Sequence, residues 1–202
     1  MKLYYAPGAC SMAPHIALRE AGLGFELEKV DLAAKKTEHG ADYLSVNPKG
    51  YVPALALDNG EVLTEVQVVL QYIADQAAES NLTPQPGSID RYRLQEWLGF
   101  IATELHKGFA PLWKPNTPDS YKPIVHENLE RRFDYLDGQL DGRDYLAGAG
   151  FTIADAYCFT ILNWANFRDI DLSRWPNLKA YVGRVAARPK VQEAMRAEGL
   201  LK

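Results

Sequence analysis

The 202-residue sequence contains only two cysteines, Cys10 and Cys158, which lie far apart in different surroundings. This pair does not make a disulfide framework and indicates reduced thiols, as in a cytoplasm. Long apolar runs are missing too: no stretch approaches the roughly 20 uncharged apolar residues that are needed to span a bilayer. The opening MKLYYAPGAC also lacks the continuous apolar segment of a secretion signal. We therefore expect a cytoplasmic protein without a membrane span.

The sequence has no excess of basic charge. Its 22 lysines and arginines are outnumbered by 26 aspartates and glutamates, giving a net charge of −4. No basic stripe is available to neutralise a phosphate backbone, so nucleic acid is not an expected partner. His15, His39 and His126 have no partner at metal-ligand spacing, and we expect no metal site. The 47% hydrophobic content is typical of a globular protein with a core.

Residues 1–80 predict an α/β domain of the thioredoxin-like kind. Strand patterns and turn signals give the order β-α-β-α-β-β-α. The expected strands are 2–5, 25–30, 51–57 and 61–63, the last two joined by the hairpin turn Asp58-Asn59-Gly60, and the first and last helices are about 11–21 and 65–77. A polar stretch and a turn cluster at Asn47–Gly50 separate the second strand from the third.

Proline and glycine then mark a linker at residues 81–87, and residues 88–202 predict an all-α domain. Apolar residues recur there at helical spacing. The segment from Ile153 to Trp164 is almost entirely apolar, so we expect it to form the core of this domain. Thr152 and Asp155 precede and begin that helix in the pattern of a capping box, with Asp155 as the carboxylate.

Cys10 is the main candidate for chemistry. It directly precedes the first predicted helix, where unpaired N–H groups and the helix dipole stabilise a thiolate. The alternative is that Cys10 is a small buried apolar residue. Three residues later the chain has Ala13 where a dithiol motif would have a second cysteine. Redox chemistry at Cys10 would therefore need an external thiol.

Three further places carry weaker signals. A cis bond before Pro53 would present the peptide groups of Val52 to a bound peptide, although an ordinary trans proline fits the pattern too. At the start of the third helix, the Val66 N–H and the Glu65 carboxylate suit an α-amino acid head group, although Glu65 also fits as a simple first-turn acid. Gly99, Thr103 and His106 form a helical stripe from which His106 could donate to a bound thiolate, unless the stripe is a solvated face.

Several segments together resemble the Beta-class glutathione S-transferases of bacteria over essentially the whole chain. They are YYAPGACSMAPHIALREAG, VNPKGYVPAL, the TE dipeptide before the third helix, IATELHKGF and FTIADAY. The resemblance implies a thioredoxin-like domain followed by an all-helical domain, and a homodimer. It also implies a glutathione site on the first domain, facing an electrophile site formed largely by the second.

The resemblance also assigns roles to individual residues. Cys10 would contact the glutathione sulfur or form a mixed disulfide with it, and Val52, before cis-Pro53, would pair with the cysteinyl backbone. Glu65 and the Val66 N–H would hold the γ-glutamyl head, and Lys35 would hold the glycine carboxylate. His106 would assist at the sulfur, and further binding groups, some offered by the neighbouring subunit, would come from Gly99, Thr103, Glu104, Leu105, His106 and Lys107.

Two positions depart from the family pattern. Position 66 is Val where Ser or Gly is usual, which loses a hydroxyl contact but keeps the backbone N–H. Position 99 is Gly where Asn is common, which removes a polar group near the thiol. Each lost hydrogen bond costs about 0.5–1.5 kcal/mol, so each change would weaken glutathione binding several-fold without abolishing it.

Our leading interpretation is a transferase that conjugates glutathione to hydrophobic electrophiles, as in detoxification. Tyr51, Phe109, Trp113 and Trp164 supply aromatic surface for such an acceptor, although aromatic residues are more often core. One alternative is a glutathione-dependent thiol-disulfide oxidoreductase or reductive dehalogenase acting through Cys10. The other is a non-catalytic ligand carrier that has kept the fold.

Overall fold

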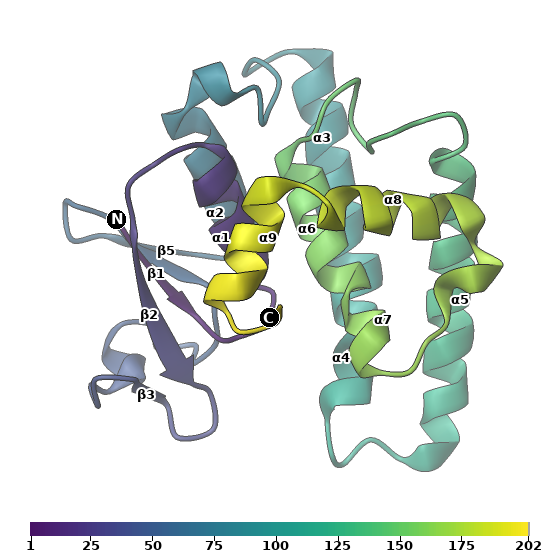
Figure 1. Cartoon of the computed structure of the whole chain (residues 1–202). Coiled ribbons are helices and arrows are strands. Elements are labelled where there is room, and N and C mark those ends of the chain that lie inside the picture. The colour runs from purple at the N-terminus through teal and green to yellow at the C-terminus, as the bar shows by residue number, and fades with distance from the viewer. Residues whose placement is uncertain (202) are drawn as a thin grey trace. The chain divides into compact units, whose positions relative to one another are not determined.

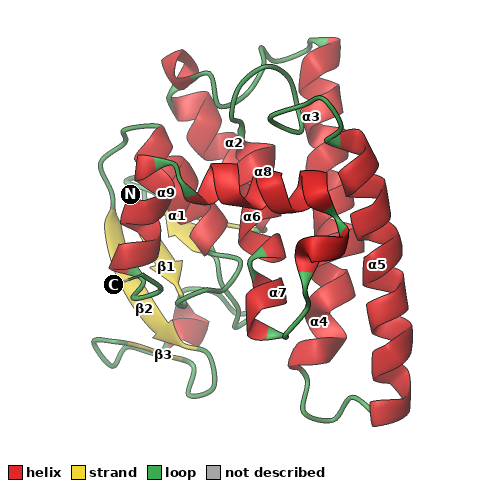
Figure 2. Ribbon diagram, turned by 45° about the vertical axis from the view of Figure 1, so that its right-hand side comes forward, coloured by secondary structure: helices red, strands yellow, loops and turns green. Residues whose placement is uncertain are grey.

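The structure is a computed structural model that describes residues 1–201, and its chain divides into two compact units. The first unit comprises Met1–Thr83 together with the chain from Arg188 onward, and the second comprises Pro84–Ala187. Figures 1 and 2 trace the strands in the first unit and the longest helices in the second.

The first unit contains a five-stranded sheet in the order β3-β2-β1-β4-β5. β1 pairs parallel to β2 and antiparallel to β4, and the remaining pairs are antiparallel. The strands are β1 (Lys2–Tyr5), β2 (Glu26–Asp31), β3 (Lys36–Thr37), β4 (Ala54–Ala56) and β5 (Val62–Thr64), with helices α1 (Met12–Glu20) and α2 (Val66–Gln76) and a short turn η2 (Ala78–Ser80). The crossover from β1 through α1 to β2 gives the thioredoxin-like arrangement that the sequence predicted.

The sequence predicted a helix between the second and third strands, and this prediction is wrong. That stretch instead forms β3 and a single 3₁₀ turn, η1 (Tyr43–Ser45). Its backbone takes positive φ angles at Lys35, Gly40 and Gly50, which an α-helix does not accommodate. The Asp42 side chain caps the short turn by accepting from the Leu44 N–H. The segment therefore folds as a chain of turns.

The third strand is shorter than predicted and begins at Ala54, because the residues before it are engaged elsewhere. The Tyr51 carbonyl accepts from the Tyr43 hydroxyl (2.9 Å) and the Asn47 amide (2.7 Å). Pro53 has no N–H to offer a neighbouring strand.

Helix α9 (Pro189–Ala197) belongs to the first unit, whereas we expected it within the helical domain at 88–202. Its apolar face, with Val191 and Ala194, is fully buried, and it packs against α1 (Figure 1). Arg188 adds a bidentate ion pair to Glu20 of α1, at 2.7 and 2.9 Å. The spacing of apolar residues predicts an amphipathic helix but does not identify the surface that covers its apolar face.

The second unit is all-helical, and α6 is buried along its whole length. The unit contains α3 (Ile89–Phe100), the π-helical segment η3 (Ile101–His106), α4 (Lys107–Trp113), η4 (Asp119–Tyr121), α5 (Lys122–Gln139), α6 (Ile153–Leu162), α7 (Trp164–Phe167), η5 (Leu172–Arg174) and α8 (Pro176–Ala186). α6 packs against α3, η3, α7 and α8. The apolar segment predicted to form the core of the helical domain therefore does so.

The start of α6 depends on a buried carboxylate. Asp155 accepts from the Thr152 N–H (2.8 Å) and hydroxyl (2.9 Å). Thr152 and Asp155 together form the capping box of α6. The other oxygen of Asp155 accepts from the Leu146 N–H (2.9 Å) and the Tyr181 hydroxyl (3.1 Å). Burial raises the pKa of Asp155, while the four donors oppose that rise. Asp155 thus ties the α5–α6 connection and α8 to the start of the core helix.

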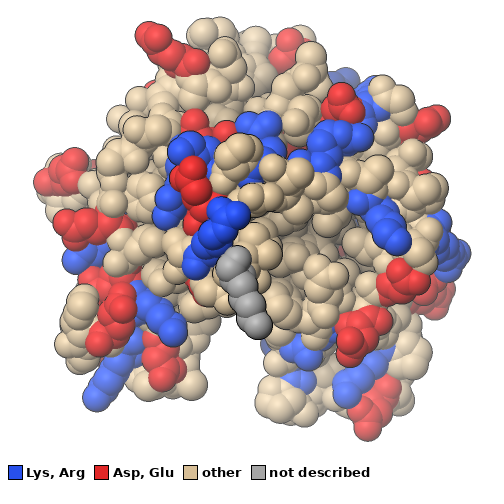
Figure 3. All heavy atoms as spheres, in the orientation of Figure 1, with Lys and Arg blue, Asp and Glu red and all other residues tan. Residues whose placement is uncertain are grey.

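No helix within residues 1–201 is long and apolar enough to cross a membrane. On the face drawn in Figure 3, basic and acidic side chains are interspersed.

We predict that Asp155→Ala lowers the free energy of unfolding by about 3 kcal/mol or more, because it removes the cap and leaves the Leu146 N–H and the Thr152 N–H and hydroxyl buried without their acceptor. The Tyr181 hydroxyl keeps a contact with the backbone carbonyl of residue 155 (3.4 Å). Urea unfolding followed by circular dichroism measures the change. Asp141→Ala, which removes an exposed carboxylate of the same unit, is the control and should change stability by less than about 0.5 kcal/mol. Equal effects of the two substitutions would contradict the structural role of Asp155.

Candidate active site

Cys10 lies in the loop between β1 and α1, with only 8% of its surface exposed. Its thiol donates to the Val52 carbonyl across 3.3 Å. The N–H groups of Met12 and Ala13 donate to the carbonyls of Ala9 (3.0 Å) and Cys10 (3.2 Å). These two N–H groups at the start of the helix are therefore paired already, contrary to the unpaired donors that we expected there.

Val52 is the partner that positions the Cys10 sulfur. It precedes Pro53 through a cis peptide bond, and its side chain is buried. Val52 packs in a small core with Val30, Tyr43 and Ala54. The sulfur therefore rests on a backbone carbonyl that is anchored in the core of the first unit.

Glu65 lies at the start of α2, in a backbone conformation with φ of 69°. Its carboxylate accepts from the Lys49 ammonium group (2.6 Å) and the Tyr51 hydroxyl (2.8 Å). The hydrogen bond to Glu65 raises the pKa of both partners. Val66, the first residue of α2, is buried. Our sequence reasoning did not assign Lys49 a role, because its turn segment carries no pattern that points to Glu65.

Lys35 contacts the same segment. Its ammonium group donates to the Gly50 carbonyl across 2.6 Å. Cys10, Lys35 and Glu65, which are distant in sequence, thus each contact one short stretch of chain, Lys49–Val52. The structure therefore brings together the side chains that the resemblance assigned to the first domain.

The second-unit candidates lie on and around a π-helical turn. The spacing of Gly99, Thr103 and His106 assumed a regular α-helix, but η3 spans Ile101–His106 and widens the turn between them. The Thr103 hydroxyl donates to the Gly99 carbonyl across 3.1 Å. The regular α-helix that this spacing assumed is therefore interrupted between Gly99 and His106, and the sequence offered no signal for the π-helix.

Three neighbouring candidates in this stretch differ in their surroundings. Glu104 accepts from Arg132 of α5 through two nitrogens, at 3.0 and 2.6 Å. Leu105 is fully buried in the core of the unit, and Lys107 is exposed. Glu104 thus links η3 to α5, a link that sequence spacing did not indicate.

His106 is held by an aromatic cluster. Its Nδ1 lies 2.7 Å from the hydroxyl of Tyr157, and its ring makes edge contacts with Tyr157 and Trp164. Sequence reasoning missed Tyr157, although an aromatic hydroxyl in a mostly apolar helix is a signal that could have found it. The ring of His106 is therefore fixed by α6 and α7.

The proposed acceptor aromatics divide into core and surface residues. Phe109 is fully buried and Trp164 nearly so, whereas Trp113 is 41% exposed. The guanidinium group of Arg168 lies 3.7 Å from the ring centroid of Trp113, a cation–π contact. Phe109 is thus core rather than available surface.

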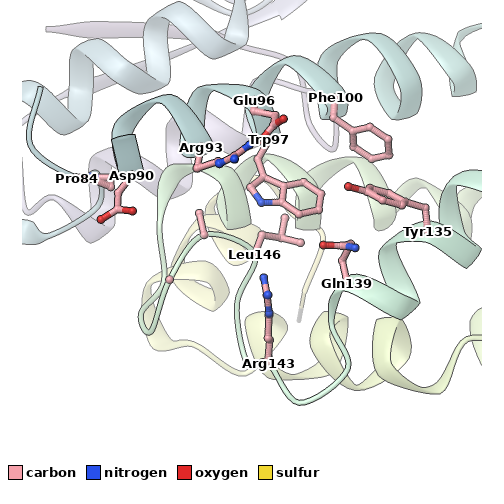
Figure 4. Close-up of a pocket in the computed structure, with 12 residues that line it drawn as sticks. Pro84, Asp90, Arg93, Glu96, Trp97, Phe100, Tyr135, Gln139, Arg143 and Leu146 are labelled. Carbon is pink, nitrogen blue, oxygen red and sulfur yellow. Dashed lines mark hydrogen bonds and ion pairs between the residues drawn. The ribbon is translucent and has the colours of Figure 1, made fainter. Parts of the chain in front are cut away.

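A pocket between α3, α5 and the loop after α5 forms a separate feature of the second unit (Figure 4). Trp97, Phe100 and Tyr135 form its aromatic wall through mutual ring contacts. Gly99 and the stretch 103–107 lie outside its lining. The pocket is therefore distinct from the residues predicted to bind glutathione.

Residues 1–201 contain no group of three or more His, Cys, Asp or Glu side chains arranged to hold a metal ion. Neither Cys10 nor Cys158 forms a disulfide bond. Cys158 is fully buried, and burial raises the pKa of its thiol. Of the two thiols, Cys10 is the one placed in a loop beside other polar candidates.

Comparison with known proteins agrees with this geometry. Residues 8–76 match the glutathione S-transferase N-terminal domain, and residues 100–189 match the glutathione S-transferase C-terminal domain. The chain is 50% identical over 200 residues to glutathione S-transferase GstA of Escherichia coli O157:H7, covering 99% of this chain and 100% of that one.

Solved structures extend the match to the whole fold. A Beta-class glutathione S-transferase of Sphingomonas chungbukensis has a TM-score of 0.97 at 49% identity, covering all of both chains. A sphingomonad glutathione S-transferase complexed with glutathione has a TM-score of 0.96 at 52% identity, covering 99% of this chain and all of that one. The chain therefore belongs to the glutathione S-transferase family and to its bacterial Beta class.

Proposed function

We propose that the chain conjugates glutathione, through its sulfur, to small hydrophobic electrophiles, with Cys10 and His106 at the reacting sulfur. The observation that carries this proposal is the convergence of Cys10, Lys35 and Glu65 on the segment Lys49–Val52. A tripeptide with a thiol and charged ends needs such a set of groups. The transferase names of the relatives favour conjugation over disulfide exchange or a carrier role.

In the proposed complex, the backbone of Val52 pairs with the cysteinyl residue of glutathione. Glu65 takes the γ-glutamyl ammonium group, and the Val66 N–H takes the neighbouring carboxylate. Lys35 pairs with the glycine carboxylate. The Glu65 oxygen that now accepts from Lys49 and Tyr51 would then share its charge with the ligand.

We propose that the second unit supplies the remaining groups. Gly99 and the stretch Thr103–Lys107 complete the glutathione site, with His106 donating a hydrogen bond to the sulfur. The glutathione thiol gives its proton to solvent water, the thiolate forms a bond to the electrophilic carbon, and the leaving group departs with the electron pair of its bond to that carbon. The exposed ring of Trp113 offers apolar surface for the acceptor.

We further propose that the chain works as a homodimer in a cytoplasm, as the resemblance implies. Two cysteines in a chain of 202 residues, neither of them in a disulfide bond, suit a reducing compartment.

The test uses glutathione-agarose retention, turnover of a chloro-nitroaromatic acceptor, and intact-mass spectrometry after incubation with oxidised glutathione. We expect retention, turnover and a reducible adduct on the wild-type protein. Cys10→Ala should lose the adduct but bind glutathione within roughly tenfold of wild type, because most contacts come from other residues. Cys158→Ala, which removes the buried thiol, is the control and should keep the adduct.

Each part of the proposal has a contradicting outcome in this test. An adduct that persists in Cys10→Ala would rule out the covalent role of Cys10. Retention with an adduct but no turnover would favour disulfide exchange. Failure of the folded wild-type protein to bind glutathione would contradict the proposal as a whole.

For Glu65, we predict that Glu65→Gln weakens glutathione binding by roughly 10- to 100-fold, because a charged hydrogen bond to the ammonium group is lost. Calorimetric titration measures the affinity for glutathione and for its analogue without the γ-glutamyl amine. The variant should bind the two ligands about equally, whereas wild type should prefer glutathione. Glu61→Gln, which changes an exposed carboxylate at β5, is the control and should preserve the preference.

At position 99, we predict that Gly99→Asn strengthens glutathione binding by about three- to tenfold, through one added hydrogen bond. A Cβ atom at Gly99 would meet nothing within 4 Å, so the helix can accept the side chain. Gly183→Asn in α8 is the matched control, because a Cβ there also meets nothing within 4 Å. Both should gain a few tenths of a kcal/mol in helix stability, but only Gly99→Asn should change affinity. An unchanged affinity would remove Gly99 from the site.

A further inference from the structure

The chain beyond helix α9 reaches back to the loop that carries Cys10. Glu198 follows α9 directly, and its carboxylate is buried. One oxygen, Oε2, accepts from the N–H of Gly8 across 2.9 Å. Gly8 is buried, has a φ of 70° and lies two residues before Cys10. A buried negative charge therefore holds the backbone of the Cys10 loop.

The second oxygen of Glu198 completes a chain of hydrogen bonds through His15 of α1. Oε1 lies 2.8 Å from His15 Nδ1, and both side chains are fully buried. The Arg19 Nε–H donates to His15 Nε2 across 2.9 Å. Because Nε2 accepts, the proton of a neutral His15 lies on Nδ1 and is donated to Glu198. Both oxygens of the carboxylate are thus matched by a donor.

The backbone around Glu198 is fixed independently. The Leu200 N–H bonds to the Met195 carbonyl (2.8 Å) and the Gly199 N–H to the Arg196 carbonyl (3.0 Å). Gly199 has a φ of 74°, which completes a Schellman motif at the end of α9. With α9 packed on α1, Glu198 is presented from a rigid helix end.

Side chains contribute to the hydrogen bonds that hold the loop around Cys10, beside the backbone bond from the Ala9 N–H to the Ala6 carbonyl (3.0 Å). The Ser11 hydroxyl bonds to the Ala6 backbone, the Cys10 thiol to the Val52 carbonyl, and Gly8 to Glu198. The first is local, and a thiol is a weak donor. Of the three, the contact between Gly8 and Glu198 is the one with a charged acceptor, and such bonds are about twice as strong as neutral ones.

We propose that Glu198, oriented by His15, is a positioning residue that keeps the Cys10 sulfur at the Val52 carbonyl. This inference rests on the proposed function only in taking that sulfur as the site of action. The inference predicts a local effect. Loss of the Glu198 contact should free the Cys10 loop, while the rest of the first unit stays folded.

The test is Glu198→Gln, read out by the alkylation rate of each cysteine in peptide maps after iodoacetamide treatment. Gly8 and His15 contact different oxygens of Glu198, and Gln has an oxygen at only one of these positions, so one of the two donors would face its NH₂ group. We expect Cys10 to react about tenfold faster than in wild type, while buried Cys158 stays unreactive. With a chloro-nitroaromatic acceptor, kcat should fall while the KM for that acceptor stays unchanged.

Glu193→Gln is the matched control, because Glu193 lies on α9 and contacts Arg19 (3.4 Å) but is not bonded to the loop. In Glu193→Gln, Cys10 should be alkylated at the wild-type rate.

A second pair of variants changes His15, the partner of Glu198. His15→Asn keeps a donor for Glu198 and should preserve the slow alkylation of Cys10, whereas His15→Leu should raise the alkylation rate. The pair keeps the test valid if Glu198→Gln folds poorly.

Two outcomes would overturn the inference. The first is that Cys10 is alkylated no faster in Glu198→Gln and in His15→Leu than in Glu193→Gln. The other is a parallel rise at Cys158 in both variants, which would show that the group holds the fold as a whole. Alkylation needs no turnover, so absence of conjugation by wild-type protein would contradict the proposed function alone.

Discussion

Proline at position 53 keeps the preceding residues out of the sheet, and the site of the first unit depends on this constraint. Without an N–H, Pro53 cannot join the ladder, and the strand begins only at Ala54. The segment Lys49–Val52 therefore keeps its polar groups available for side chains. Lys35, Cys10 and Glu65 contact it from three parts of the chain. The segment Lys49–Val52 ends where strand β4 begins, at Ala54. Its Val52 carbonyl in turn positions the Cys10 thiol.

The parts of the fold that sequence predicted well have local causes. The turn Asp58-Asn59-Gly60 lies between β4 and β5, and the capping pattern at Thr152 and Asp155 starts a helix that is buried throughout. In each case the residues that create the pattern also make the interaction. Local chemistry of this kind can be read without knowing what lies opposite in the folded chain.

The parts that sequence did not predict depend on partners distant in the chain. The π-helical segment ends at His106 and makes two long-range hydrogen bonds. Glu104 bonds to Arg132, 28 residues later, and His106 bonds to Tyr157. Helix α9 shows an amphipathic pattern, but nothing in that pattern tells whether its apolar face covers α1 or another helix. Long-range pairing chooses among surfaces that are locally equivalent. The fold class was therefore predictable from residue patterns, whereas much of the detailed geometry around the site residues was not.

The hydrogen-bonding environment of the Cys10 sulfur is set by its neighbours rather than by the helix that begins after it. A thiolate cannot donate to the Val52 carbonyl and would face the negative end of that dipole. The N–H groups of Met12 and Ala13, which could otherwise support an anion, are paired with backbone carbonyls. A ligand that pairs with the Val52 backbone would compete for the acceptor of this thiol, so ligand binding and the environment of the sulfur are coupled through one carbonyl group.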